Sequence, residues 1–192
     1  MSEPTPTETI VFPAEPQRPA PMAAPNLQFM LAHPAHVIAL GFGAGLSRVA
    51  PGTAGTLAAW FAFHALSPWM DDLSWAVVII LSTVMGWWAG TVTARNMGVA
   101  DPGSIVWDEV VAFWLVLWLV MPTGFMGQAV AFALFRFFDA VKPGPVGWAD
   151  ALFHQVDPQR DRHAWAKAGW GIMFDDLVAA GCTVLVIALW RF

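Results

Sequence analysis

The chain has 192 residues, of which 57% are hydrophobic and 12% are charged, and its mean hydropathy is +0.57. Soluble domains contain about 45–50% apolar and about 25% charged residues, so this composition argues against a soluble globular protein and predicts an integral membrane protein. Nine Lys and Arg residues against fourteen Asp and Glu residues leave a net charge of −5 and no basic stripe, which argues against a nucleic-acid partner.

The N-terminal segment, residues 1–26, differs from the rest of the chain. It holds seven of the fifteen prolines, three acidic residues and one basic residue. Such a segment cannot bury enough apolar surface to become ordered, and it lacks the basic start and apolar core of a signal peptide. We therefore expect a disordered cytoplasmic tail over residues 1–30 and a single domain over residues 31–192.

The next segment, residues 37–56, is apolar but rich in glycine. Five glycines within 15 residues disfavour a straight helix, because glycine loses more backbone entropy in a helix than other residues do. We expect a short broken helix, followed by a loop that leads into the first membrane span.

Five apolar stretches follow this segment. Residues 73–89 carry no charge and are long enough to cross a bilayer. The other four stretches are shorter, and they are residues 56–70, 110–121, 125–135 and 177–190. To span the membrane, they require additional polar helical turns at one end or a locally thinned bilayer. The pattern predicts an all-α polytopic helical bundle with four to five short spans. The alternative is a peripheral protein whose helical hairpins do not cross the membrane. Cys182, the single cysteine, excludes an intramolecular disulfide and a cysteine-based zinc site.

Basic residues alternate with the connections between these stretches. The connections at residues 71–72 and 122–124 contain no Lys or Arg, whereas Arg95 follows the second stretch and residues 136–167 contain five basic residues. Because basic residues favour the cytoplasmic side, this pattern predicts the cytoplasmic segments, which are residues 1–52, 93–108 and 139–174.

The polar clusters of the chain fall on this predicted cytoplasmic face. They are the glycine-rich residues 41–56, residues 101–109, the set Arg136, Asp139 and Lys142, and residues 169–176. Ionisable groups next to apolar membrane segments are costly and often functional. Each cluster also has a structural interpretation: acidic pairs can cap helices, Arg136 and Asp139 can form an i, i+3 ion pair, and glycines permit close helix packing.

The combination of these clusters suits a divalent metal and a phosphate. Mg²⁺ prefers carboxylate, water and phosphate oxygens, Arg and Lys bind phosphate, and glycine-rich backbone can present N–H groups to an anion. At headgroup depth, the phosphate is expected to belong to a lipid.

Several phosphatase chemistries are excluded by missing motifs. The chain has no Asp-x-Asp, no Cys-x₅-Arg, no Lys-x₆-Arg-Pro and no Walker A loop. What remains is metal-assisted attack by water, with a carboxylate that orients or deprotonates the water.

Four sequence elements occur in a characteristic order: GFGAGLS with PGT (41–47 and 51–53), GSIVWDE (103–109), FR with Asp139 and KP (135–143), and GIMFDD (171–176). In these elements the chain resembles the bacterial phosphatidylglycerophosphatase A family, over residues 36–190. The proline-rich tail is longer than expected for that family, and residues 153–168 look like an insertion.

The resemblance implies a multi-pass, all-helical enzyme of the bacterial inner membrane, with its active face cytoplasmic. It implies a phosphoric monoester hydrolase that uses Mg²⁺ to convert phosphatidylglycerophosphate to phosphatidylglycerol in phospholipid biosynthesis. We accordingly predict the metal ligands and water-positioning carboxylates to be Asp108, Glu109, Asp175 and Asp176. We predict that Asp139 is a further metal ligand or holds Arg136 in place. Arg136 and Lys142 are predicted to bind the phosphate, and Asp101 is predicted to support the loop. The predicted headgroup pocket is lined by Ser104, Gly43, Ser47 and Thr53.

Two other classes of function are weighed against this one. A phosphotransferase of lipid headgroups also uses carboxylates at the cytoplasmic face, but the chain lacks the spaced aspartates of Asp-Gly-x₂-Ala-Arg…Gly-x₃-Asp-x₃-Asp. A cation-coupled transporter would place acids at mid-bilayer between repeated halves, and a lipid-binding scaffold would show no metal-dependent turnover. The sequence leaves the oligomeric state open.

Overall fold

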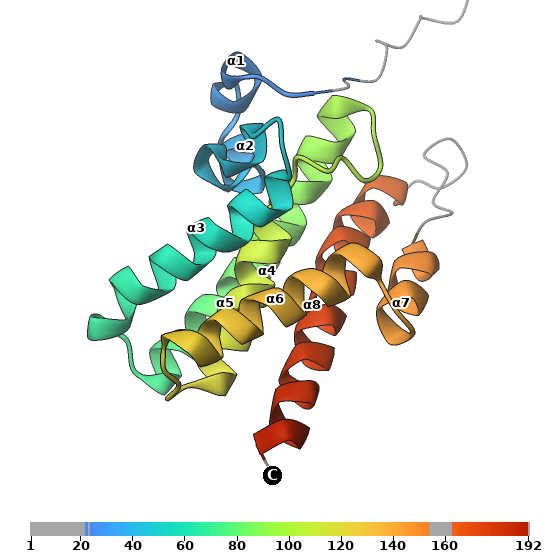
Figure 1. The fold of residues 1–192 in the computed structure, drawn as a ribbon. Helices are drawn as coiled ribbons and strands as arrows, with labels where there is room; N and C mark the ends of the chain where they lie inside the picture. Colours follow the sequence, from blue (N-terminus) through green and yellow to red (C-terminus); the bar gives the residue numbers. More distant parts are fainter. Residues whose placement is uncertain (1–21, 23, 154–162, 192) are drawn as a thin grey trace, which may run out of the picture.

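The computed structural model describes residues 22, 24–153 and 163–191, and this part of the chain contains helices and loops but no strand (Figure 1). The all-α prediction is therefore confirmed. The helices are α1 (Leu27–Leu31), α2 (Pro34–Ala39), the 3₁₀ helix η1 (Gly41–Leu46), α3 (Pro51–Leu66), the 3₁₀ helix η2 (Ser67–Trp69), α4 (Asp72–Met97), α5 (Trp107–Val120), α6 (Phe125–Val141), α7 (Pro145–Phe153) and α8 (Ala164–Arg191).

Two of the described helices, α4 and α8, are long and apolar enough to cross a membrane. Both are longer than the apolar stretches that predicted them, because polar turns continue them beyond residue 89 and before residue 177. The helices α3, α5 and α6 have 16, 14 and 17 residues. The structure thus has two long helices, α4 and α8, whereas the sequence predicts only residues 73–89 as a stretch of full spanning length.

Helix α5 forms the centre of the bundle and packs against α3, α4, α6 and α8. Its residues Val111, Phe113, Val116 and Leu117 are fully buried. A helix that is apolar on every side must be surrounded by protein or lipid. Here the neighbouring helices surround it, so its apolar residues form the main core.

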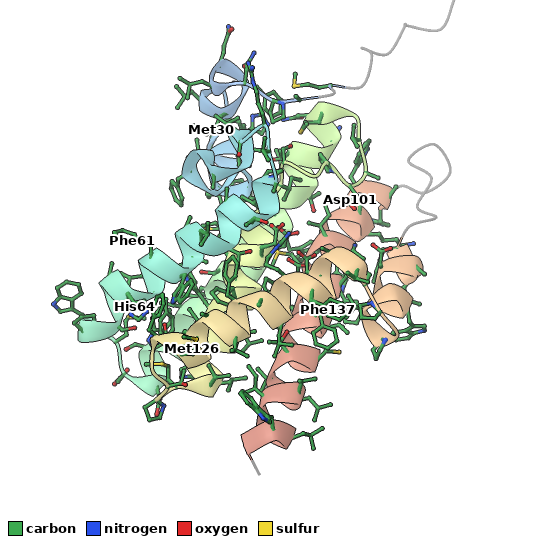
Figure 2. All side chains as sticks on the ribbon, viewed as in Figure 1. Met30, Phe61, His64, Asp101, Met126 and Phe137 are labelled. Atoms are coloured by element: carbon green, nitrogen blue, oxygen red, sulfur yellow. The ribbon has the colours of Figure 1, made fainter. Side chains whose placement is uncertain are left out.

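The outer faces of the bundle remain apolar. Phe61 on α3 and Met126 and Phe137 on α6 are all more than half exposed (Figure 2), as is Leu189 on α8. Extended exposed apolar surface marks a site of contact with protein or membrane. Together with α4 and α8, these faces indicate association with a membrane.

The segment before α3 contains the expected break. Helix α2 ends at Ala39, and within η1 Phe42 and Gly43 have positive φ values of 54° and 112°. The value at Gly43 lies in a region that side-chain-bearing residues rarely adopt, so the glycine permits the bend. The chain then re-enters a helix at Pro51, whose ring suits the first helical position.

The predicted boundary of the N-terminal tail and the predicted insertion both differ from the helix boundaries in the structure. Helix α1 begins at Leu27, so the boundary at residue 30 falls inside an ordered helix, while residues 1–21 and 23 lie outside the described part of the chain. Of the segment that looks like an insertion, residues 154–162 also lie outside the described part, and residues from Ala164 onward already belong to α8.

The helix ends position the polar residues. Helices α5 and α6 pack against α8, and α3 packs against α5; the end of α6 lies at the upper half of α8, while the end of α8 lies at the opposite end of the molecule (Figure 1). This arrangement brings together residues that are far apart in sequence: Gly52 lies beside Glu109 and Arg136, and Asp176 lies beside Asp108 and Glu109.

Candidate metal and phosphate site

Three carboxylates converge at the start of α5. Asp108 and Glu109 lie in its first turn, and Asp176 faces them from α8. One oxygen from each of the three lies within 4.8 Å of the others, and the residues are only 8%, 8% and 3% exposed. Negative charge in the first turn of a helix is favoured by the helix dipole, which partly explains why α5 tolerates two adjacent acids there.

Each of these acids has a buried oxygen without a hydrogen-bond partner among the described residues. These oxygens are Asp108 Oδ1, Glu109 Oε2 and Asp176 Oδ2, and Asp175 Oδ1 shares this property. Burying a carboxylate without compensation is costly. A divalent cation with oxygen coordination would satisfy the oxygens of Asp108, Glu109 and Asp176, which lie together, so this donor set fits the Mg²⁺ that the sequence predicts.

The capping interpretation of the second acidic pair is wrong. Helix α8 begins at Ala164, so Asp175 and Asp176 lie three turns inside it and cannot cap free N–H groups. The apolar stretch starting at residue 177 suggested a helix start there, because hydropathy does not detect the polar turns that precede it. A buried acidic pair in the middle of a long helix needs another explanation: Asp175 pairs with Lys142, and Asp176 belongs to the group of three carboxylates that could hold a metal ion.

Arg136 on α6 connects three helices. It forms the predicted i, i+3 ion pair with Asp139, and its Nη1 also lies 3.6 Å from Glu109 Oε1 on α5 and donates to Thr56 Oγ1 on α3 at 3.5 Å. These contacts all use Nη1, and a guanidinium carries five N–H donors. Arg136 therefore retains capacity to bind a further anion.

Gly52 makes room for this contact network. A Cβ atom at Gly52 would overlap Glu109 Oε1 and would lie only 3.1 Å from both terminal nitrogens of Arg136. The first turn of α3 can approach the charged pair because this position has no side chain. The glycine is thus required by the close approach of α3 to α5 and α6.

Lys142 follows α6 directly and adopts a left-handed conformation, with φ 49°. Its Nζ donates to Asp150 Oδ1 on α7 at 2.5 Å and to Asp175 Oδ2 on α8 at 2.6 Å. Burial alone would lower the pKa of the ammonium, but the hydrogen bonds and charges of Asp150 and Asp175 outweigh this and raise the pKa above its ordinary value. Lys142 is therefore a fixed cation across the physiological pH range.

Sequence reasoning missed Asp150. It lies eight residues after Lys142, beyond a turn at Gly144, so no helical spacing relates the two residues. The only available signal is that Asp150 is a lone acid in an otherwise uncharged segment. The contact between Asp150 and Lys142 depends on the packing of α7 against α8.

Six of the predicted residues line one small cavity of about 150 Å³. They are Asp108, Glu109, Asp139, Lys142, Asp175 and Asp176, and Asp101 of the loop before α5 joins them. Arg136 contacts two of these residues, so the predicted metal and phosphate residues form one cluster.

The four predicted headgroup residues do not line this cavity. Ser104 lies between the lining residues Gly103 and Ile105, but its hydroxyl points to Met97 Sδ at 3.9 Å. The Ser47 hydroxyl donates to Val49 O in an exposed turn. Gly43 lies in η1 and Thr53 lies in the first turn of α3.

Comparison with known proteins identifies the family of this chain. The phosphatidylglycerophosphatase A family model matches residues 37–191. The protein of that name from Escherichia coli K12 is 38% identical over 152 residues, covering 78% of each chain. Its namesake from Haemophilus influenzae is 36% identical over 163 residues, covering 85% of this chain and 92% of the relative.

A third relative carries a different name. A protein from Bacteroides thetaiotaomicron, provisionally named a phosphatidylinositol-3-phosphatase, is 36% identical over 164 residues, covering 81% of this chain and 92% of the relative. No solved structure matches the chain. The family model spans every residue of the cavity, and the two namesakes each cover more than three quarters of the sequence, so the chain belongs to the phosphatidylglycerophosphatase A family.

Proposed function

We propose that this protein hydrolyses the terminal phosphomonoester of phosphatidylglycerophosphate to give phosphatidylglycerol, with Mg²⁺ as its cofactor. The observation that carries the proposal is the convergence of buried, incompletely satisfied carboxylates beside Arg136 and Lys142. The names of the two relatives above support the choice of substrate.

The acids of the cavity would hold the metal. Asp108, Glu109 and Asp176 would bind it, because one oxygen of each lies within 4.8 Å of the others. Asp175, which the sequence predicts as a fourth ligand, does not belong to this group of oxygens, and its Oδ1 would remain available to the substrate. When bound, Mg²⁺ supplies Lewis-acid stabilisation of the negative charge on the phosphate. The family relationship and the unsatisfied oxygens both support this assignment.

The remaining groups would bind the phosphate and accept the proton that the attacking water loses. Arg136 offers its free N–H donors to the phosphate oxygens, and Lys142 adds a fixed positive charge. Hydrolysis forms a P–O bond to water and breaks the P–O bond to glycerol. A carboxylate of the cavity accepts the proton from water, and the departing glycerol oxygen takes up a proton. Asp139 keeps Arg136 oriented at the edge of the cavity.

We further propose that α3, α4, α5, α6 and α8 all cross the inner membrane, with the cavity at the cytoplasmic side. At about 1.5 Å per residue, α5 would be only about 21 Å long, shorter than the roughly 30 Å hydrocarbon core. Its neighbours shield it from lipid, however, so its length need not match the bilayer. Exposed Trp69 and Trp190 at the far ends of their helices suit the opposite interface.

The orientation can be tested by cysteine labelling. Val49→Cys and Gly124→Cys, each made in a Cys182→Ser background, place single thiols at exposed positions on opposite ends of the bundle. A membrane-impermeant maleimide should label Val49→Cys only in inverted vesicles and Gly124→Cys only in right-side-out vesicles. The reverse pattern would place the cavity on the outer side, and equal labelling of both thiols in sealed vesicles would mean that the bundle does not cross the membrane.

The activity is tested with purified protein in detergent micelles. Phosphate release is measured from phosphatidylglycerophosphate, phosphatidic acid and phosphatidylinositol 3-phosphate, with Mg²⁺ and then with EDTA. We expect Mg²⁺-dependent release from the first lipid and little from the others. Preferred release from phosphatidylinositol 3-phosphate would instead assign the protein the activity for which the Bacteroides relative is named. If folded protein released phosphate from none of the lipids, the proposed phosphatase activity would be refuted.

Gly52→Ala is expected to lower turnover of phosphatidylglycerophosphate by about 10- to 100-fold, because displacement of reacting groups by about 1 Å has effects of this size. The new methyl group would displace Glu109 and Arg136. Gly181→Ala is the matched control, because a Cβ atom at that position on α8 meets nothing within 4 Å. It should retain full turnover. Normal activity of Gly52→Ala would mean that the Glu109–Arg136 contact is not needed.

A further inference from the structure

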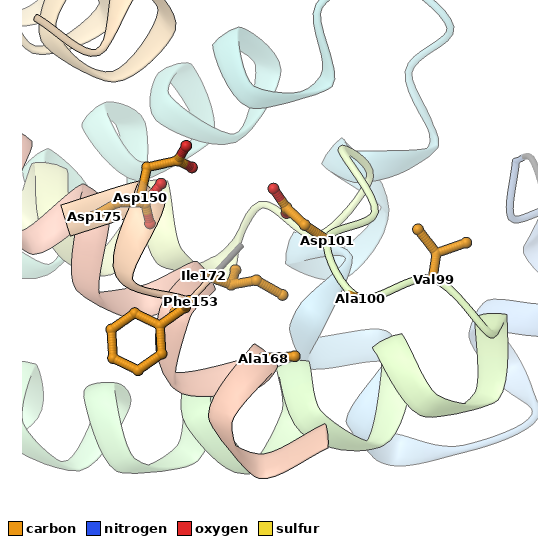
Figure 3. A pocket seen from close by; sticks show the side chains of 9 residues that line it. Val99, Ala100, Asp101, Asp150, Phe153, Ala168, Ile172 and Asp175 are labelled. Atoms are coloured by element: carbon orange, nitrogen blue, oxygen red, sulfur yellow. The ribbon is translucent and has the colours of Figure 1, made fainter. Parts of the chain in front are cut away.

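A second and larger cavity, of about 370 Å³, adjoins the metal and phosphate cavity (Figure 3). It lies between the α4–α5 connection, α7 and α8, which contribute Val99, Asp150, Phe153 and Ala168 among others. The two cavities share Asp101, Ile172 and Asp175 as lining residues and are therefore contiguous. Small-molecule sites typically have volumes of about 300–1,000 Å³, so the larger cavity can hold a part of a substrate whose phosphate lies in the smaller one.

Asp175 links the two cavities chemically. It is 7% exposed, and its Oδ2 accepts from Lys142 at 2.6 Å. Its Oδ1 is buried and has no hydrogen-bond partner among the described residues. A buried acceptor in this state loses hydrogen-bond energy unless a ligand donates to it. Its position at the junction of two cavities makes a bound molecule the natural donor.

The lining of the larger cavity selects a type of ligand. Three carboxylates (Asp101, Asp150 and Asp175) line it together with the apolar side chains of Val99 and Phe153. Carboxylates accept hydrogen bonds from hydroxyl groups and repel a second anion. Apolar side chains pack against C–H groups. A polyol, which combines hydroxyl and C–H groups without charge, matches this lining.

We propose that the larger cavity binds the glyceryl part of the substrate headgroup and thereby selects phosphates that are carried on a polyol. The assignment rests on the proposed function, because it takes the neighbouring cavity to hold the phosphate. The free hydroxyl of the glyceryl unit donates to Asp175 Oδ1. Phosphatidic acid has no hydroxyl-bearing unit between its phosphate and its acyl-bearing glycerol, so it leaves this acceptor unsatisfied.

The test compares three competitive inhibitors of phosphatidylglycerophosphate hydrolysis: inorganic phosphate, ethyl phosphate and glycerol 3-phosphate. The last two have the same charge but differ in hydroxyl groups. The ratio of their inhibition constants therefore measures how strongly the larger cavity binds the hydroxyl groups. The inhibition constant of inorganic phosphate measures binding in the smaller cavity. For the native protein we expect glycerol 3-phosphate to bind about tenfold more tightly than ethyl phosphate, the scale of one hydrogen bond to a buried carboxylate.

Val99→Phe and Ala168→Leu fill the larger cavity from two sides without altering a residue that lines the smaller one. Each should bring the ratio close to one and leave the inhibition constant of inorganic phosphate within about twofold, which also verifies folding. Ala151→Leu, on the exposed face of α7, is the matched control and should keep the native ratio.

The outcomes separate the two proposals. Native protein that hydrolyses the lipid but shows no preference for glycerol 3-phosphate refutes the polyol site and leaves the phosphatase intact. The same conclusion follows if both filled variants bind inorganic phosphate normally and keep the native ratio. Native protein that hydrolyses none of the lipids refutes the phosphatase, and the assignment of the larger cavity with it.

Discussion

Asp108→Asn is expected to lower kcat for phosphatidylglycerophosphate by about 10²–10³-fold or more, the scale of removing one preorganised electrostatic contact from an active site. Asp108 is 8% exposed, and its Oδ1 is one of the buried oxygens that lack a partner in the described part of the chain. Asparagine keeps the size of the side chain but removes the negative charge that the cation requires.

The same variant has a second expected effect, which only a metal site explains. In metal-free protein, Asp108→Asn removes one of several neighbouring like charges, and this should raise the melting temperature. Added Mg²⁺ should stabilise the native protein by mass action and should stabilise the variant much less. A merely structural acid would show the opposite behaviour, because its loss would lower the melting temperature with or without Mg²⁺.

The control for this pair of measurements is Asp72→Asn. Asp72 is exposed in the first turn of α4, where it accepts a hydrogen bond from Trp118 Nε1 at 3.2 Å, and it lies at the end of the bundle away from the cavity. Its replacement should change neither kcat nor the response to Mg²⁺. Native turnover by folded Asp108→Asn protein would show that Asp108 is not a metal ligand.

Arg136→Ala is expected to lower kcat/KM by about 10²-fold or more, since truncating one partner of a buried, hydrogen-bonded charge pair costs about 2–5 kcal/mol. The variant loses the proposed phosphate contact and leaves Glu109 and Asp139 without their cation. Part of the loss therefore arises from repulsion among the acids. A lowered melting temperature should accompany it.

Arg136→Lys separates charge from geometry. Lysine keeps the positive charge, but a single ammonium cannot reproduce the planar fork that contacts Glu109, Asp139 and Thr56. We expect stability close to native and kcat/KM still about tenfold below native. Arg95→Lys, at the exposed last turn of α4, is the matched control and should have native activity. Full activity of Arg136→Lys would assign Arg136 a purely electrostatic role.

Local patterns in the sequence predicted much of the helical architecture. Apolar stretches located α3, α4, α5, α6 and the second half of α8, because burial and membrane contact both require continuous apolar surface. The Arg136–Asp139 ion pair also followed from spacing alone, since residues three apart lie on the same face of a helix. Both kinds of signal lie within a few helical turns.

The start of α8 and the partner of Lys142 could not be predicted in this way. Residues 164–176 contain polar and charged side chains, so hydropathy favoured a helix start near residue 177, whereas packing against α4, α5, α6 and α7 extends the helix to Ala164. Asp150 reaches Lys142 only because the turn at Gly144 folds α7 back toward α8. Both features depend on tertiary contacts, which override local preference.

The sequence by itself singled out the charged residues that meet at one cavity: carboxylates at 108, 109, 139, 175 and 176, with one arginine and one lysine near them. Only the tertiary structure decided which of them share a cavity, that Ser104, Gly43, Ser47 and Thr53 do not line it, and that a second cavity opens beside Asp175. The physical reason is that residue type and spacing set the charge and helical face of a side chain. The distance between side chains on different helices is set by packing, which depends on the whole chain.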